Sequence, residues 1–314
     1  MSLAVKYRPD TFDNVVGQEF VTSILKHQLY TNTLKRSYLF VGPSGCGKTT
    51  CARILAKNLS CTPVEIDAAS NNGVDDVRKI IESANFKNIA GGNKVYIIDE
   101  CHMLSISAWN ALLKLLEEPP LHCTFILCTT DPQKIPATII SRVQRFNFRK
   151  ISINEIIERL NEILIVEGRK LQDDIIFEIA RSANGGMRSA ITMLDKVLDY
   201  DGNISYSDAC NILDITGQLE LSKLVDAIYG CDVVTTIDII ENFDYLGKDF
   251  KILVRELFDF VFDENKECLL KGKRDNRLME ILNLLINIIN EIKYDTNPKN
   301  IVLSELLLSY NNWE

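Results

Sequence analysis

Four short apolar runs, rich in β-branched and aromatic residues, stand out in the first half of the chain. They cover residues 37–41, 64–67, 94–99 and 124–130 and predict buried strands. Residues 48–59, between the first two runs, have helical spacing. Strands that are apolar along their whole length and separated by helices are typical of a parallel sheet covered on both faces. The pattern therefore predicts an α/β domain.

Beyond residue 148 the period of the apolar positions changes. A stripe with helical spacing is formed by Ile156, Ile157, Leu160, Ile163 and Leu164, and glycine-containing breaks divide this region into several helices. The last hundred residues also have helical spacing without strand-like alternation, for example at 278–292 and 301–310. We therefore expect an α/β domain, a small helical lid and an all-α collar, at residues 1–148, 149–213 and 214–314.

Composition limits the class of protein. With 314 residues, 46% of them hydrophobic and 25% charged, the chain is typical of a soluble globular protein large enough for two or three domains. No apolar run is long enough to cross a bilayer, and the N-terminus lacks the apolar segment of a signal peptide. We therefore expect a cytoplasmic protein without a membrane partner.

The net charge of −8 lies entirely in the last third of the chain. Residues 1–213 carry 24 acidic and 24 basic residues, whereas residues 214–314 carry 19 acidic and 11 basic residues. A net negative charge normally argues against nucleic-acid binding. Because the surplus is confined to the C-terminal region, a DNA-facing surface in the first two-thirds stays compatible with the composition.

A glycine-rich loop follows the strand predicted at 37–41 and leads into the helix predicted at 48–59. It fits the pattern G-x-x-x-x-G-K-[ST] at every fixed position. Its residues are Gly42, Pro43, Ser44, Gly45, Cys46, Gly47, Lys48 and Thr49. Glycines let consecutive backbone N–H groups turn toward phosphate oxygens, Lys48 reaches the β- and γ-phosphates, and the Thr49 hydroxyl ligates Mg²⁺. This P-loop therefore predicts binding of ATP and Mg²⁺.

The strand predicted at 94–99 ends in two acidic residues. Asp99 is expected beside the magnesium ion, and Glu100 is expected to polarise the attacking water. A strand that ends in two acids is a weak signal by itself, because strands often end in solvated charges. In the same predicted sheet as the P-loop, the pair favours ATP hydrolysis over ATP binding alone.

Three further residues have both a functional and an ordinary interpretation. Thr130 ends the strand predicted at 124–130 and either contacts the γ-phosphate or simply closes the strand. Arg142 is either a solvated surface charge or an arginine finger that acts on the ATP of a neighbouring subunit. Arg188 is either an ordinary first-turn arginine or a residue that closes on the γ-phosphate. Spacing alone does not decide between these interpretations.

With these motifs in place, the chain resembles the clamp-loader AAA+ ATPases, and most of all the bacterial DNA polymerase III gamma/tau family. The resemblance covers nearly the whole chain and implies an AAA+ P-loop NTPase sheet, a lid and a collar. The similar segments are KYRPDTFDNVVGQE (6–19), GPSGCGKTT (42–50), EIDAASNNGVDDVR (65–78), VYIIDECHMLSISAWNALLKLLEEPP (95–120), TTDPQKIPATIISR (129–142) and GGMRSA (185–190).

The resemblance implies roles that composition and spacing do not. It implies that Thr50 belongs to the phosphate-binding segment. The residues that it places around adenine are Ala4, Arg8, Val15 and Val16. The residues that it places near the DNA backbone are Asn71, Asn72 and Arg78, although exposed polar residues are also usual in a loop and at a helix start.

The resemblance also assigns the two sensor residues and the arginine finger. Thr130 matches the first sensor and Arg188 the second, and Arg142 matches the finger that acts in trans. The family's Ser-Arg-Cys motif has here become Ser141-Arg142-Val143, so the cysteine is replaced while the arginine is kept.

Two departures from the family bear on metal binding and on domain content. The family usually has a four-cysteine zinc module after the P-loop helix, where this chain has only the short segment 59–63. The nine cysteines form no Cys-x-x-Cys pair, which argues against a zinc site. The chain also stops after the predicted collar. We therefore expect a compact form of the subunit that binds no zinc and has no C-terminal extension.

The main hypothesis is an ATPase subunit of a clamp loader. It implies a homo- or hetero-oligomer of loader subunits, expected to be a pentamer, that loads a sliding clamp onto primer–template DNA. A RuvB-like motor is one alternative, although its C-terminal domain should be a basic winged helix with strands. A non-catalytic structural subunit is another, although it would not need an intact P-loop and the pair Asp99 and Glu100.

Overall fold

The computed structural model of the chain has two compact units, residues 1–199 and residues 200–314. The boundaries predicted at 148 and 213 lie inside these units, so the division into three domains stays a prediction. The structure describes residues 2–87, 92–200, 202, 204–293 and 297–313.

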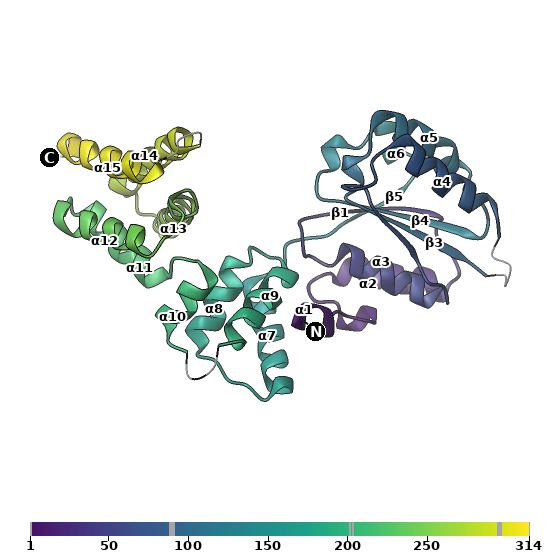
Figure 1. The fold of residues 1–314 in the computed structure, drawn as a ribbon, viewed down its shortest axis with the longest axis horizontal. Coiled ribbons are helices and arrows are strands. Elements are labelled where there is room, and N and C mark those ends of the chain that lie inside the picture. Colours follow the sequence, from purple (N-terminus) through teal and green to yellow (C-terminus); the bar gives the residue numbers. More distant parts are fainter. Residues whose placement is uncertain (1, 88–91, 201, 203, 294–296, 314) are drawn as a thin grey trace. The chain divides into compact units, whose positions relative to one another are not determined.

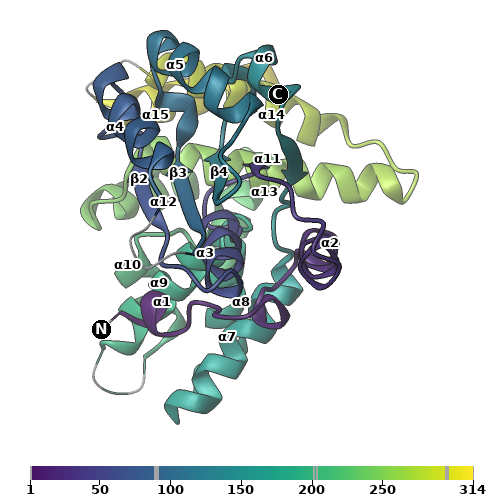
Figure 2. The same ribbon diagram turned by 90° about the vertical axis from the view of Figure 1, so that its right-hand side faces the viewer.

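A five-stranded parallel sheet forms the centre of the first unit (Figure 1). Its strands are β1 (Ser37–Val41), β2 (Val64–Asp67), β3 (Lys94–Asp99), β4 (Cys123–Thr129) and β5 (Gln144–Asn147). In space they follow the order β2–β3–β4–β1–β5, and Figure 2 shows β2, β3 and β4 side by side. The predicted α/β fold is therefore confirmed, with each of the four predicted strands within one residue of its expected bounds.

Helices cover both faces of the sheet because consecutive strand residues point to opposite sides. On β1, Tyr38 and Phe40 belong to one apolar cluster, whereas Leu39 and Val41 belong to the other. The helices on the first side are α2 (Glu19–Tyr30) and α3 (Lys48–Asn58), and those on the second are α4 (Val74–Asn85), α5 (Ile106–Glu117) and α6 (Ala137–Ile140) (Figure 1). The shorter helices are α1 (Leu3–Lys6), η1 (Phe12–Asn14), η2 (Cys101–Met103) and η3 (Pro132–Lys134).

The edge strand β5 is not predicted by the apolar pattern. Of its four residues only Phe146 is buried, so the segment lacks the continuous apolar run of the other strands. It is held by pairing with β1 and by the contact of Phe146 with Phe40, whose ring centroids are 5.8 Å apart. The formation of β5 therefore depends on its pairing with β1, because its own sequence has little strand character.

Three helices complete the first unit and form the region predicted as the lid. They are α7 (Ile153–Glu167), α8 (Asp173–Ser182) and α9 (Met187–Leu198). Of the predicted stripe, Ile156, Leu160 and Ile163 are completely buried and Leu164 is nearly so, whereas Ile157 is only partly buried. A capping box starts α7: the Ser152 hydroxyl accepts a hydrogen bond from the Glu155 N–H, and the Glu155 carboxylate accepts one from the Ser152 N–H.

The second unit is helical throughout its described residues, as predicted for the C-terminal region. Its helices are α10 (Tyr206–Leu213), α11 (Gln218–Tyr229), α12 (Val233–Tyr245), α13 (Phe250–Leu270), α14 (Asn276–Ile292) and α15 (Pro298–Trp313). Leu257, Ile281 and Leu306 lie in one buried cluster that spans α11 to α15. None of the helices described in either unit has both the length and the apolar character needed to cross a membrane.

Glu155 ties the start of the lid to the segment that leads into it. Its carboxylate accepts hydrogen bonds from Arg149 Nη2 at 2.7 Å and from the Ser152 hydroxyl at 2.6 Å. These donors, Arg149 foremost, lower the pKa of Glu155 from 4.5 to about 2.

We expect Glu155→Gln to lower the free energy of unfolding by about 1 kcal/mol at pH 7, because half-exposed Arg149 leaves the ion pair partly screened. Since folding lowers the pKa of Glu155, its stabilisation is full above about pH 4.5 and is lost as the pH falls toward about 2. The difference from wild type should therefore shrink over that range. Denaturant unfolding at several pH values measures it, with exposed Glu158→Gln on the same helix as the control. A difference that stays constant with pH would contradict the assignment.

Candidate nucleotide-binding site

The P-loop joins β1 to α3 at the carboxyl edge of the sheet. The N–H of Gly42 donates to the carbonyl oxygen of Thr129 at 3.1 Å, which attaches the start of the loop to β4. A Cβ atom on Gly42 would lie only 2.6 Å from the carbonyl oxygen of Phe148, so a larger residue does not fit there. The remaining part of the loop, from Ser44 to Thr50, lines a pocket.

Lys48 is the first residue of α3 and is almost completely buried, with 6% of its surface exposed. Its Nζ donates to the carbonyl oxygens of Gly42 and Pro43, at 2.8 Å each. Gly42 and Pro43 therefore hold the ammonium group although they do not line the pocket themselves. An ammonium group has three donors, so these two bonds leave one for a phosphate oxygen.

Thr49 and Asp99 bring two oxygen ligands together beside the loop. The Thr49 hydroxyl donates to Asp99 Oδ2 at 2.7 Å, which links the start of α3 to the end of β3. Both residues line the pocket. Hydroxyl and carboxylate oxygens are ligands that Mg²⁺ accepts, and Mg²⁺ in such sites completes its shell with water and phosphate. The pair therefore fits the predicted magnesium site.

The cysteines in the first unit act as packing residues. Cys46, within the P-loop, is 1% exposed and its Sγ donates to the carbonyl oxygen of Pro43 at 3.0 Å. Burial raises the pKa of the Cys46 thiol, and it raises the pKa of Cys51 to about 12. All nine cysteines are free thiols, and no group of three or more His, Cys, Asp or Glu suited to a metal ion occurs among the described residues. The expected lack of zinc stays a prediction.

Glu100 stands at the junction of β3 and η2 and lines the pocket. Its backbone has the left-handed conformation, with φ at 46°, which is uncommon for a residue with a side chain. Thr130, just after β4, donates from its hydroxyl to Glu100 Oε2 at 3.1 Å. Thr130 itself does not line the pocket. The hydrogen bond from Thr130 to Glu100, the candidate catalytic base, therefore links the ends of β3 and β4.

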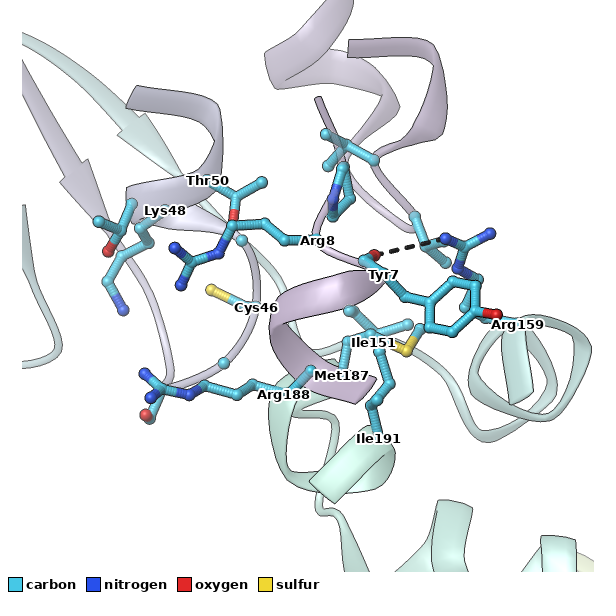
Figure 3. Close-up of a pocket in the computed structure, with 18 of the residues that line it drawn as sticks. Tyr7, Arg8, Cys46, Lys48, Thr50, Ile151, Arg159, Met187, Arg188 and Ile191 are labelled. Atoms are coloured by element: carbon cyan, nitrogen blue, oxygen red, sulfur yellow. Dashed lines mark hydrogen bonds between the residues drawn. The ribbon is translucent and has the colours of Figure 1, made fainter. Parts of the chain in front are cut away.

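The N-terminal segment forms another wall of the pocket. Ala4, Arg8, Val15 and Val16, which the resemblance places around adenine, all line it. Further lining residues, to which the sequence assigned no role, are Tyr7, Pro9, Asn14, Ile151, Arg159, Met187 and Ile191; Figure 3 labels Tyr7, Ile151, Arg159, Met187 and Ile191. Several belong to α7 and α9, and their approach to the N-terminal segment has no signal in the sequence.

Polar contacts attach α1 to the lid helices. The Leu3 N–H donates to Asp195 on α9 at 3.0 Å, and Glu167 at the end of α7 accepts from Lys6 at 2.7 Å and from the Tyr7 hydroxyl at 2.5 Å. Figure 2 shows α1 beside α9. The wall predicted at adenine is therefore built from two distant parts of the chain.

Positive charge is concentrated on the loop side of the pocket. In Figure 3 the side chains of Arg8 and Arg188 extend toward the same side of the pocket, where Lys48 also lies. Burial, followed by repulsion from Arg53 and Arg188, lowers the pKa of the Arg8 guanidinium. Because like charges held in one pocket repel, a bound anion would relieve the repulsion. The pocket is therefore suited to a phosphate-bearing ligand.

The P-loop also contacts the lid directly. Gly45 has φ at 72°, and a Cβ atom there would lie 3.2 Å from Cα of Gly186, which precedes α9. Arg188 enters the pocket two residues later. The position of Arg188 relative to the loop therefore depends on close backbone packing between two glycines.

Arg142, the residue predicted as the arginine finger, lies outside the pocket. It follows α6, and its Nε donates to Glu117 Oε1 at 2.5 Å, while its Nη1 donates to the carbonyl oxygen of Thr138 at 2.5 Å. A third of its side chain is exposed. Arg142 is therefore not brought together with the P-loop of its own chain.

The three residues predicted near DNA are exposed and lie away from the pocket. Asn71 donates from its amide to the carbonyl oxygen of Asp67 at 3.1 Å, and Arg78 pairs with Asp75 at 2.9 Å on α4. Asn72 lies in the same loop, and its carbonyl oxygen accepts from the N–H of Ser105. None of these contacts bears on DNA, so a role at DNA stays a prediction.

Solved structures with a similar fold include the Thermotoga maritima RuvB Holliday junction branch migration motor. The TM-score is 0.55 at 20% identity, and the match covers 71% of this chain and 79% of that one. A likeness at this level of identity concerns the fold alone. The predicted AAA+ P-loop fold is confirmed.

Sequence comparison identifies closer relatives. A family model described as "DNA polymerase III, delta subunit" matches residues 17–73 and 64–152. The tau subunit of DNA polymerase III from Bacillus subtilis is 41% identical over 82% of this chain and 50% of its own length. The tau subunit from Escherichia coli is 36% identical over 81% of this chain and 44% of its own length.

The chain thus spans about half the length of the curated relatives that it matches. The matches cover about four-fifths of this chain, and identities between 34% and 41% recur in relatives from several bacteria. The resemblance of this chain to the bacterial DNA polymerase III gamma and tau subunits, predicted from its motifs, is therefore confirmed.

Proposed function

We propose that this chain is an ATP-hydrolysing subunit of a clamp loader and that it acts as one member of an oligomer. The observation that carries the proposal is the separation of two sets of groups. Lys48, Asp99 and Glu100 line one pocket, whereas Arg142 lies outside it on the exposed surface. An arginine supplied by a neighbouring subunit would complete such a site.

Each of the main pocket residues has a separate proposed role in ATP hydrolysis. Lys48 would hold the β- and γ-phosphates, Thr49 and Asp99 would hold Mg²⁺, and Glu100 would orient and polarise water. When bound, Mg²⁺ neutralises charge on the phosphates. Arg188 comes from the lid, so its contact with phosphate would couple the nucleotide to the angle between lid and sheet.

The proposed partners are a sliding clamp, primer–template DNA and other loader subunits. The relatives are subunits of DNA polymerase III, which supports a role in replication. The acidic surplus lies in residues 214–314, which we propose as the oligomerising collar. At physiological salt, charge more than about 10 Å away is strongly screened, so an acidic collar does not preclude DNA binding elsewhere.

A branch-migration motor is the competing function, because the RuvB motor shares the fold. Two observations favour the loader. This chain is 20% identical in sequence to the RuvB motor but 41% identical to the tau subunit of Bacillus subtilis. The second unit also has no strand among its described residues, whereas a winged-helix domain would need strands.

ATPase turnover with different DNA partners separates the two functions. The purified chain is assayed alone and with partner subunits, with a sliding clamp, with primer–template DNA and with four-way junctions. The loader predicts strong stimulation only when clamp and primer–template DNA are both present. Equal stimulation by four-way junctions without a clamp would contradict the loader and support the motor.

We expect Lys48→Ala to weaken ATP binding by about 10-fold or more, because a charged donor to phosphate is lost. Lys57→Ala is the matched control, since Lys57 is an exposed lysine on the same helix. Equilibrium titration with a fluorescent ATP analogue measures both variants. If Lys48→Ala and Lys57→Ala bind equally well, the pocket is not the phosphate site.

We expect Arg142→Ala to leave ATP affinity unchanged. The rate of DNA-stimulated ATP hydrolysis should fall by a factor of about 10³ or more, as for other arginine fingers. Glu117→Ala is the matched control, because it breaks the same ion pair and leaves the guanidinium in place. Steady-state turnover in the complete assembly compares them. A similar loss in both variants would mean that the ion pair, and not a finger, matters.

A further inference from the structure

His102 follows Glu100 by two residues, and the sequence motifs assign it no role. It belongs to η2, its side chain is 12% exposed, and it does not line the pocket. Its Nδ1 lies 3.2 Å from Glu100 Oε2 and 3.1 Å from Thr129 Oγ1. Thr129 is completely buried at the end of β4 and accepts from the Asp131 N–H at 3.0 Å. The imidazole therefore bridges a fixed group on β4 and the candidate base.

The position of the ring proton follows from these partners. A carboxylate accepts hydrogen bonds and does not donate them, so Nδ1 can donate to Glu100 only if it carries a proton. The hydrogen bond between Nδ1 and Thr129 Oγ1 is compatible with either tautomer, whereas the short contact with Glu100 favours the tautomer that carries its proton on Nδ1.

We infer that His102 is a positioning residue that holds the Glu100 carboxylate in the orientation needed to polarise water. This inference rests on the proposed ATPase function, in which Glu100 is the base. His102 Nδ1 lies 3.2 Å from Glu100 Oε2, and its hydrogen bond with Thr129 Oγ1 at 3.1 Å anchors the ring to β4. The same oxygen accepts from the Thr130 hydroxyl at 3.1 Å, so His102 and Thr130 both contact it.

Two features explain why Glu100 needs such support. Its backbone is in the left-handed region, and a third of its side chain is exposed, so packing alone does not fix the carboxylate. A base must lie within about 2.6–3.2 Å of the group whose proton it attracts. Misplacement of a reacting group by about 1 Å can lower a rate about 100-fold. His102 thus acts through orientation and not through contact with the substrate.

Substitutions of His102 separate positioning from folding. Asparagine keeps an N–H donor near the place of Nδ1, whereas glutamine carries its donor farther along, near Nε2. We expect His102→Ala and His102→Gln to lower kcat roughly 10- to 100-fold, with KM and ATP affinity changed less than about 2-fold. His102→Asn should recover most of the lost kcat. Thermal unfolding of each full-length variant reports on stability.

The kinetic outcomes distinguish this inference from the proposed function. Glu100→Gln and the complete clamp-loading assay are included as references. If the wild-type chain and Glu100→Gln hydrolyse ATP equally slowly under all conditions, the proposed function fails and the inference falls with it. If wild type is active but His102→Ala matches it, or His102→Asn is no better than His102→Gln, only the inference is overturned.

The ring proton gives a test that does not depend on activity. The chain has three histidines, which makes their ring nitrogens assignable by ¹⁵N-detected NMR with His102→Asn as the assignment variant. His122 is an internal reference, because its Nε2 lies 3.1 Å from the carbonyl oxygen of Ala84 and must carry a proton there. We expect His102 to be protonated at Nδ1. A neutral His102 ring with its proton on Nε2 alone would overturn the inference.

Discussion

The parallel order of β3, β4 and β1 is the constraint on which the candidate site depends. Parallel strands end at the same edge of a sheet, so the segments that follow these three strands meet there although they are far apart in sequence. The P-loop follows β1, Asp99 and Glu100 close β3, and Thr129 and Thr130 close β4. The hydrogen bonds between Thr49 and Asp99 and between Thr130 and Glu100 are consequences of this order.

A second constraint is the attachment of the N-terminal segment to the lid. The sheet supplies the phosphate side of the pocket, but the wall predicted at adenine exists only because α1 is held against α7 and α9. The close approach of Gly45 to Gly186 brings Arg188 toward the loop in the same way. The lid is thus part of the site, and a change in its angle would alter the pocket on two sides.

Much of the fold and the centre of the site could be predicted from the sequence because their signals are local. Continuous apolar runs mark β1, β3 and β4, and the P-loop pattern marks residues that a phosphate cradle requires one after another. Strand β5 could not be predicted in this way, since it has one buried residue and depends on β1 for its pairing. The role inferred for His102 could not be predicted either, because its position beside Thr129 is a tertiary contact with no local sequence pattern.

The sequence by itself therefore predicted the class of ligand and the groups proposed around its phosphates, because consecutive residues bring those groups together. It determined the helical character of the C-terminal region for the same reason. Only the tertiary structure decided which residues of the lid face the pocket, that Arg142 lies outside it, and that Thr130 and His102 both contact Glu100. These contacts join segments that are far apart in sequence. They depend on how the sheet and lid pack, so no local sequence pattern predicts them.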